Sequence, residues 1–304
     1  MAEKTLDFLV IGAGKSATTT LFEWAKHHPQ IYMPEVKEAP FYDDEEVYKK
    51  GLDWYLNAYF AQAPENQTTG TITPQYMLGR EDTTPEVIAQ RIKQDFPDIK
   101  LVAVLRDPIE RSFSHHKMAL RRGNTHNSFD EDVKTLLDRD LSPDRANITP
   151  QSNFLIASEY GRILSGFYDL FDPNQLLVLF TEEIQADPQS ALKKFFSFIG
   201  VDEKFIPSNI ETSYHKGGGQ PKTKILTANF LFRVPFIEKL WKNLIPHPVR
   251  KKVENKINRW NVKPSTETTT SYSEETENKL IEHFQEDIQL LEKLSQRAPP
   301  WKRW

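Results

Sequence analysis

The sequence predicts an α/β fold in which a parallel sheet is covered by helices on both faces. Three continuous apolar runs, Phe8–Ile11, Leu101–Leu105 and Leu176–Phe180, show no polar alternation, which is typical of strands buried on both sides. Helical patterns separate these runs, and such alternation indicates a doubly wound sheet. We therefore expect a single domain over residues 1–304, with an α/β core over 1–205 and a helical C-terminal extension over 206–304.

The remaining elements follow from local signals. A weaker strand is expected over Thr68–Thr73, and prolines at 85 and 108 stand where the first turn of a helix tolerates them. Beyond Gly200, a basic glycine-rich loop (Lys216–Lys224) precedes an aromatic-rich helical stretch (Ile225–Trp260) and a polar connector (Thr266–Ser273). The expected helices span Thr18–His28, Pro85–Phe96, Pro108–Leu120, Phe154–Phe171, Ser190–Ile199 and Glu274–Leu294.

Composition excludes several classes of function. A net charge of −4 argues against general nucleic-acid binding. The chain has no cysteine, so disulfides, thiolate metal sites and cysteine nucleophiles are excluded. No apolar run approaches the roughly 20 residues that span a bilayer. The first run leads directly into GAGKS and resembles a strand more than a signal peptide. We expect a cytoplasmic enzyme with no membrane span, and its oligomeric state stays open.

The loop GAGKSATTT after the first strand allows three interpretations. A dinucleotide site needs a second strand that ends in an acidic residue, and HHPQIYMPEVKE provides no convincing one. A nucleoside-triphosphate P-loop needs its first glycine at position 9, which is Leu9. The third interpretation is a 5′-phosphate cradle: Gly12 and Gly14 allow a tight turn, Lys15 adds charge, and the next helix directs amides at an anion. The alternative to a site is a hydroxyl-rich helix cap.

A second anion site is predicted in VLRDPIERSFSHH, residues 104–116. Arg106 emerges at the carboxyl end of a strand, and Ser114 lies two turns into the helix that follows. Because parallel strands direct their carboxyl ends at the ligand crevice, Arg106 and Ser114 can converge beside the first loop. Two anion sites suggest a nucleotide phosphorylated at both 5′ and 3′ positions. The alternative is that Arg106 only pairs with Asp107 or Glu110.

Together these motifs resemble the paired signature of the sulfotransferases that use 3′-phosphoadenosine 5′-phosphosulfate (PAPS). KEAPFYDDEEVYKKGLDWY (37–55) and TITPQYM (71–77) are similar to segments of the heparan sulfate sulfotransferases. The resemblance implies a P-loop-like sulfotransferase fold and a 3′-phosphate held by Arg106 and Ser114. It implies that the first motif holds the 5′-phosphosulfate through Gly14, Lys15, Ser16, Ala17, Thr18, Thr19 and Thr20.

The resemblance also implies a mechanism. The sulfuryl group would pass from PAPS to an unidentified hydroxyl, less favourably an amine, of a carbohydrate, a lipid-like molecule or a carrier-bound metabolite, releasing the bisphosphate PAP. Lys15 would stabilise the leaving phosphate, and no metal is implied. Glu38 would be the general base, with His115, and beside it His116, as rival.

One departure concerns Ile72, which stands where the heparan sulfate enzymes carry a lysine. Their basic loop before the last helix is also absent, and Lys216, Gly217 and Gly218 could replace it by closing over the 3′-phosphate. The other functions considered are a small-molecule or nucleotide kinase and a non-catalytic PAP-binding module.

Overall fold

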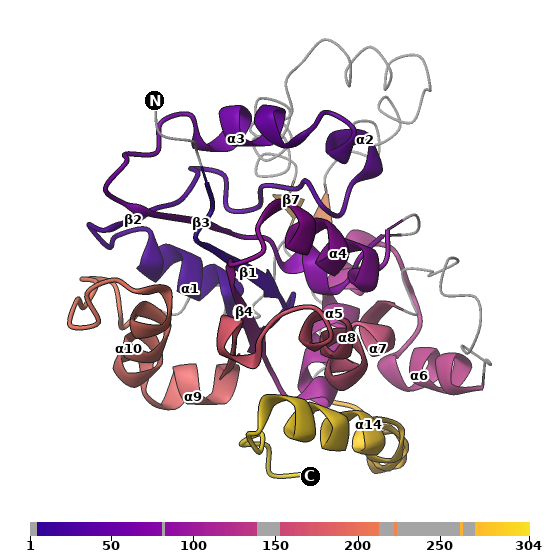
Figure 1. The fold of residues 1–304 in the computed structure, drawn as a ribbon. Helices are drawn as coiled ribbons and strands as arrows, with labels where there is room; N and C mark the ends of the chain where they lie inside the picture. The colour runs from indigo at the N-terminus through magenta and orange to yellow at the C-terminus, as the bar shows by residue number, and fades with distance from the viewer. Residues whose placement is uncertain (1–4, 81–82, 139–152, 213–221, 224–261, 264–270) are drawn as a thin grey trace.

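A five-stranded parallel sheet forms the centre of the protein (Figure 1), with strand order β2-β3-β1-β4-β5. The computed structural model describes residues 5–80, 83–138, 153–212, 222–223, 262–263 and 271–304. The expected α/β class and the four expected strands are confirmed, and a short edge strand is added. The strands are β1 (Phe8–Gly12), β2 (Ile31–Tyr32), β3 (Thr68–Ile72), β4 (Lys100–Leu105) and β5 (Leu176–Phe180).

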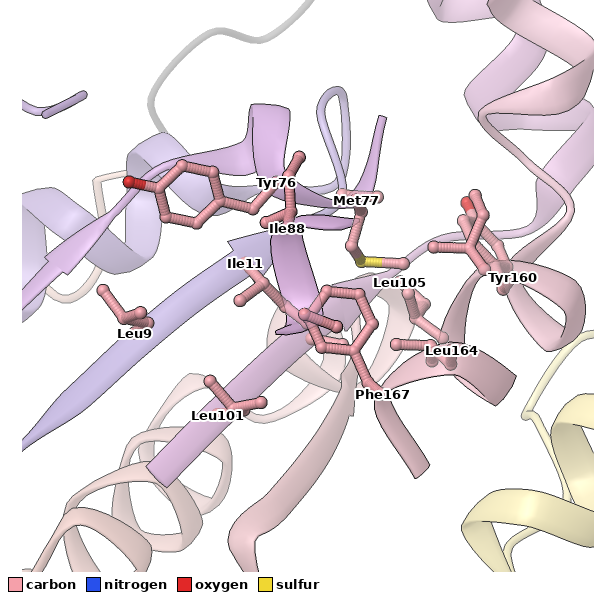
Figure 2. Packing of buried hydrophobic residues seen from close by; sticks show 14 of the residues in the cluster. Leu9, Ile11, Tyr76, Met77, Ile88, Leu101, Leu105, Tyr160, Leu164 and Phe167 are labelled. Atoms are coloured by element: carbon pink, nitrogen blue, oxygen red, sulfur yellow. The ribbon is translucent and has the colours of Figure 1, made fainter. Parts of the chain in front are cut away.

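Both faces of the sheet are buried, as the unbroken apolar runs predicted. Phe8 and Val10 of β1 pack toward one face, where the core includes α1 (Thr18–Ala25) and α10 (Pro188–Ile199). Leu9 and Ile11 point to the opposite face, which is covered by α4 (Pro85–Asp95) and α8 (Tyr160–Tyr168). Figure 2 shows residues of this second face, among them Leu9, Ile11 and Leu101 of the sheet and Phe167 of α8. Alternation along each strand therefore fills two cores.

The chain reverses its direction of travel across the sheet between β1 and β4. From β1 it passes through α1 on one face toward β2 and β3. From β4 it passes through α5 (Pro108–Arg122) on the other face toward β5. Connections of this kind leave a crevice outside the carboxyl ends of the two strands, because their helices leave in opposite directions. The loop after β1 and the segment after β4 flank that crevice.

The helix expected over Phe154–Phe171 is in fact two helices, α7 (Asn153–Ile156) and α8. Contacts from distant parts of the chain impose the break. Two buried side chains of α5 bind the carbonyl of Phe154, and the carboxylate of Asp287 accepts hydrogen bonds from the amides of Gly161 and Arg162, at 2.9 and 2.8 Å. A side chain at Gly161 would collide with the backbone of Asp287, so the glycine permits this close approach.

Shorter helices complete the described part of the chain: α2 (Glu45–Tyr48), α3 (Leu52–Phe60), α6 (Phe129–Leu137) and α9 (Thr181–Ala186). The expected last helix is confirmed as α14 (Glu274–Ser295), which packs against α8. Two residues of the predicted basic loop, Lys222 and Thr223, form β6, which pairs antiparallel with β7 (Val262–Lys263). The predicted helical stretch Ile225–Trp260 lies outside the described residues. Among those that are described, no helix is both long and apolar enough to cross a membrane.

Candidate active site

The loop after β1 begins α1 without a side-chain cap. Lys15 and Ala17 both adopt left-handed backbone conformations, with φ of 75° and 60°. Non-glycine residues adopt this conformation only where the surrounding structure imposes it, at a cost of about 1–3 kcal/mol, and such residues cluster at functional sites. Ala17 occupies the N-cap and has no side-chain oxygen to accept from the helix amides. The positive end of α1 therefore faces the crevice without a cap.

The two glycines of the loop have roles other than the expected tight turn. A β-carbon at Gly12 would lie 2.3 Å from the sulfur of Met77, so Gly12 is needed for close packing of β1 against the segment after β3. Gly14 has open space around it and contributes its carbonyl, which accepts a hydrogen bond from Arg111. The left-handed positions fall on Lys15 and Ala17 instead.

The hydroxyl groups of the first motif differ in accessibility. Ser16 is completely buried, and Thr20 is nearly so. Thr19 is half-buried. The hydroxyl of Thr18 lies 3.4 Å from the ammonium nitrogen of Lys37. Ser16, Thr18 and Thr20 thus support the loop from inside, whereas Thr19 lies nearer the surface.

Arg106 and Ser114 are brought to one face of α5. Arg106 directly follows β4, and its Nη2 lies 3.3 Å from Oε2 of Glu110. Glu110 and Ser114 are four residues apart on α5, so their side chains share a face of the helix. The guanidinium of Arg106 therefore lies on the side of α5 that carries Ser114. The ion pair with Glu110, considered as an alternative to an anion site, is present alongside this convergence.

Arg111 joins the two predicted anion sites physically. Its Nε donates to the carbonyl oxygen of Gly14 at 3.0 Å, and its Nη1 donates to the Phe154 carbonyl and the Ser158 hydroxyl at 3.0 and 3.1 Å. The side chain is nearly inaccessible to water, and burial lowers the pKa of Arg111 to about 10. The guanidinium stays charged at neutral pH and fixes α5 against the first loop.

Glu38 lies on a segment that approaches the first turn of α1. Oε2 of Glu38 accepts from Nε2 of Gln75 at 3.1 Å, and Oε1 lies 3.8 Å from Nζ of Lys37. The same ammonium group contacts Thr18, so the side chain of Lys37 links the carboxylate of Glu38 to the first turn of α1. The hydroxyl of Tyr76 binds the Ala39 carbonyl at 3.2 Å and anchors the segment to the chain after β3.

The two histidines of α5 are poor candidates for a general base. Nδ1 of His115 lies 3.1 Å from Nη2 of Arg111, and because arginine only donates, that nitrogen accepts. Neutral His115 then carries its proton on Nε2, so neither nitrogen has a lone pair to spare. His116 is completely buried 3.3 Å from the carboxylate of Asp132, and burial lowers the pKa of His116. The geometry therefore favours Glu38 over His115.

Three further predictions concern position 72, the glycine-rich loop and metal binding. Ile72 is completely buried in β3, so its side chain provides no charge or polar group to the crevice. Lys216, Gly217 and Gly218 lie outside the described residues, and their role stays a prediction. Within the described residues no group of three or more acidic or histidine side chains could hold a metal ion.

The first loop does not match either nucleotide-binding alternative. Leu9, where a P-loop requires glycine, is a completely buried strand residue. β1 lies between β3 and β4, whereas the second strand along the chain, β2, lies at the edge of the sheet. The dinucleotide interpretation needs that second strand beside the first.

This combination of fold and site defines an α/β protein with a candidate anion site at the switch point of its sheet. Residues 5–217 match the sulfotransferase domain family, and the chain belongs to that family.

Curated relatives carry the same domain within longer chains. The human bifunctional heparan sulfate N-deacetylase/N-sulfotransferase 3 is 28% identical over 227 residues, which are 71% of this chain and 25% of that protein. The mouse heparan sulfate glucosamine 3-O-sulfotransferase 3A1 is 29% identical over 209 residues, 69% of this chain and 49% of the relative. This chain therefore matches a quarter to a half of their length.

A solved structure supports the assignment of the fold. The crystal structure of a sulfotransferase from Alicyclobacillus acidocaldarius covers 98% of both chains with a TM-score of 0.66 and 20% sequence identity. At that identity the likeness concerns the fold alone.

Proposed function

We propose that this protein transfers the sulfuryl group of PAPS to a hydroxyl group of an acceptor and releases PAP. One observation carries the proposal: the uncapped loop after β1 and Arg106 after β4 flank the same crevice, joined by the bond from Arg111 to Gly14. A nucleotide with phosphate groups at the 5′ and 3′ positions of its ribose matches two such sites. The match to the sulfotransferase domain supports the same donor class.

The roles of the residues follow from charge and position. Lys15 and the first amides of α1 stabilise the negative charge that grows on the leaving phosphate. Arg106 and Ser114 bind the 3′-phosphate and set the register of the nucleotide. Glu38 accepts the proton of the attacking hydroxyl, and the amide of Gln75 fixes the orientation of its carboxylate.

Lys37 is a further cation at this site, and sequence analysis did not single it out. Its ammonium contacts both Thr18 and Glu38, so it lies between the cradle and the base. This position allows Lys37 to provide positive charge near the transferred group, where Ile72 provides none. The names of the relatives suggest a glucosamine-containing polysaccharide as acceptor, but the missing lysine at position 72 sets this chain apart, so our proposal extends only to a hydroxyl acceptor.

Ligand-induced thermal shifts test the proposal. PAP should stabilise the protein without magnesium, by about 2.7 kcal/mol at a concentration of 100 Kd, whereas ADP and NAD should stabilise it far less. Transfer from radiolabelled PAPS to a panel of hydroxyl acceptors tests turnover. Magnesium-dependent stabilisation by ATP, with indifference to PAP, would identify a kinase instead. PAP binding without transfer to any acceptor, and with no effect of Glu38→Gln on any property, would indicate a non-catalytic module.

A further inference from the structure

The carboxylate of Glu110 lies between two arginines that are far apart in the sequence. On one side, Oε2 is 3.3 Å from Nη2 of Arg106. On the other side, Oε1 is 3.2 Å from Nη2 of Arg303 and accepts from the hydroxyl of Tyr272 at 3.0 Å. The residue that pairs with Arg106 is therefore itself held by the segment around α14.

Arg303 also binds the start of α5. Its Nη1 lies 3.1 Å from Oδ1 of Asp107, the same oxygen that accepts from the amides of Ile109 and Glu110. The Nε of Arg303 lies 2.6 Å from the carboxylate of Glu277. One guanidinium thus contacts three carboxylates, and two of them belong to the RDP-x-E sequence at residues 106–110.

Aromatic packing fixes this arrangement in place. The ring of Tyr272 lies 5.0 Å from that of Phe113 on α5 and 5.5 Å from that of Phe129 on α6, between ring centroids. Trp301 is buried and donates from its indole nitrogen to Glu182 at 3.0 Å. The segment that carries Arg303 is therefore packed into the folded core.

We propose that Arg303 is a positioning residue for the 3′-phosphate and acts on Arg106 through Glu110. The idea rests on the function proposed above. An unshared Glu110 carboxylate would hold Arg106 with its full charge and repel an incoming phosphate, since both are anions competing for one guanidinium. By neutralising Glu110 from the far side, Arg303 weakens that competition and leaves Arg106 able to turn to the ligand.

Two nucleotides and two variants test the mechanism. 5′-AMP differs from PAP only in lacking the 3′-phosphate, so the ratio of their dissociation constants, measured by isothermal titration calorimetry, isolates that group. Arg303→Gln should weaken PAP about tenfold and leave AMP unchanged. Arg297→Gln is the matched control. Arg297 also anchors the 297–304 segment, to the Val178 carbonyl and Glu183, but does not contact Glu110.

The neutral variant Glu110→Gln makes the test decisive. It should tighten PAP binding, and adding Arg303→Gln in that background should have no further effect, because the carboxylate through which Arg303 acts is gone. An equal loss of PAP affinity in both backgrounds, or an equal loss for AMP, would overturn the inference and indicate a general structural role. A wild-type protein that binds PAP no better than AMP would overturn the proposed function itself, and this inference with it.

Discussion

Nε of Arg111 lies 3.0 Å from the carbonyl oxygen of Gly14, so the helix after β4 directly holds the loop after β1. The two halves of the site are separate in sequence and belong to helices on opposite faces of the sheet. A buried, charged side chain with several acceptors links them. Binding of one ligand by both halves needs this link, because the spacing of the two anion sites depends on it.

Replacing Arg111 should destabilise the protein and loosen the first loop. Arg111→Met removes a buried charge and the donors that bind Gly14, Phe154 and Ser158, and it takes from the Gly14 carbonyl the bond that holds the first loop. Losing one side of such a buried polar network costs about 3 kcal/mol. The free energy of unfolding in urea measures the loss, and Lys134→Met, at an exposed position of α6, is the matched control. Equal stability of the two variants would contradict the role given to Arg111.

Glu38→Gln should lower kcat without weakening PAP. The amide is nearly the same size as the carboxylate but cannot accept a proton, and loss of a general base costs about 10²–10⁴-fold in rate. Steady-state transfer from labelled PAPS measures kcat, and calorimetry measures PAP binding. Glu35→Gln changes an exposed carboxylate of the same segment and should leave kcat at the wild-type value. If His115→Ala lowers kcat as much as Glu38→Gln does, the assignment of the base is wrong.

Sequence patterns predicted the sheet well because its strands are buried on both faces and read as unbroken apolar runs. The two-residue β2 was missed, since so short an edge strand has no pattern of its own. The break between α7 and α8 was missed because Asp287 and α5 cause it from far away in the chain. The helix propensity of residues 154–171 depends on local sequence alone and therefore cannot indicate those contacts.

The candidate site was predicted in outline by its two motifs, but the residues between them were not. Arg111 lies within the quoted second motif, yet its importance depends on a carbonyl almost a hundred residues away in sequence. Lys37 stands beside Glu38 in the sequence, and its contact with Thr18 appears only after folding. The cytoplasmic location and the single-domain division stay predictions of the sequence.

Gly12→Ala should destabilise the protein, whereas Gly14→Ala should not. A β-carbon at Gly12 would overlap Met77 within 2.7 Å at three side-chain atoms, including the β-carbon of Met77, which cannot move without its backbone. Such overpacking costs about 1–3 kcal/mol. Gly14 has room for a methyl group, so its change in unfolding free energy should stay within about 0.5 kcal/mol. Urea unfolding of both variants checks this, and Met77→Ala should partly rescue Gly12→Ala. Equal effects at the two glycines would contradict the packing.

Asp287 should make the stability of the protein depend on pH in an unusual direction. Burial between α8 and α14 raises the pKa of Asp287 from 3.8 to about 6, although the amides of Arg162 and Gly161 partly oppose this. Between these two values the native state keeps a proton that the unfolded chain has lost. The free energy of unfolding contributed by this group therefore falls as pH rises from about 4 to 6, by at most about 3 kcal/mol, and stays level above.

Urea unfolding of wild type and Asp287→Asn across that range tests the effect. Asparagine cannot ionise. The unfolding free energy of the wild type, minus that of the variant, should therefore fall as pH rises from 4 to 6 and then remain constant. Glu286→Gln removes an exposed carboxyl one residue away on α14 and is the matched control. A wild-type curve that runs parallel to the Asp287→Asn curve would mean that Asp287 is ionised throughout, and that its two amide bonds fully offset the cost of burial.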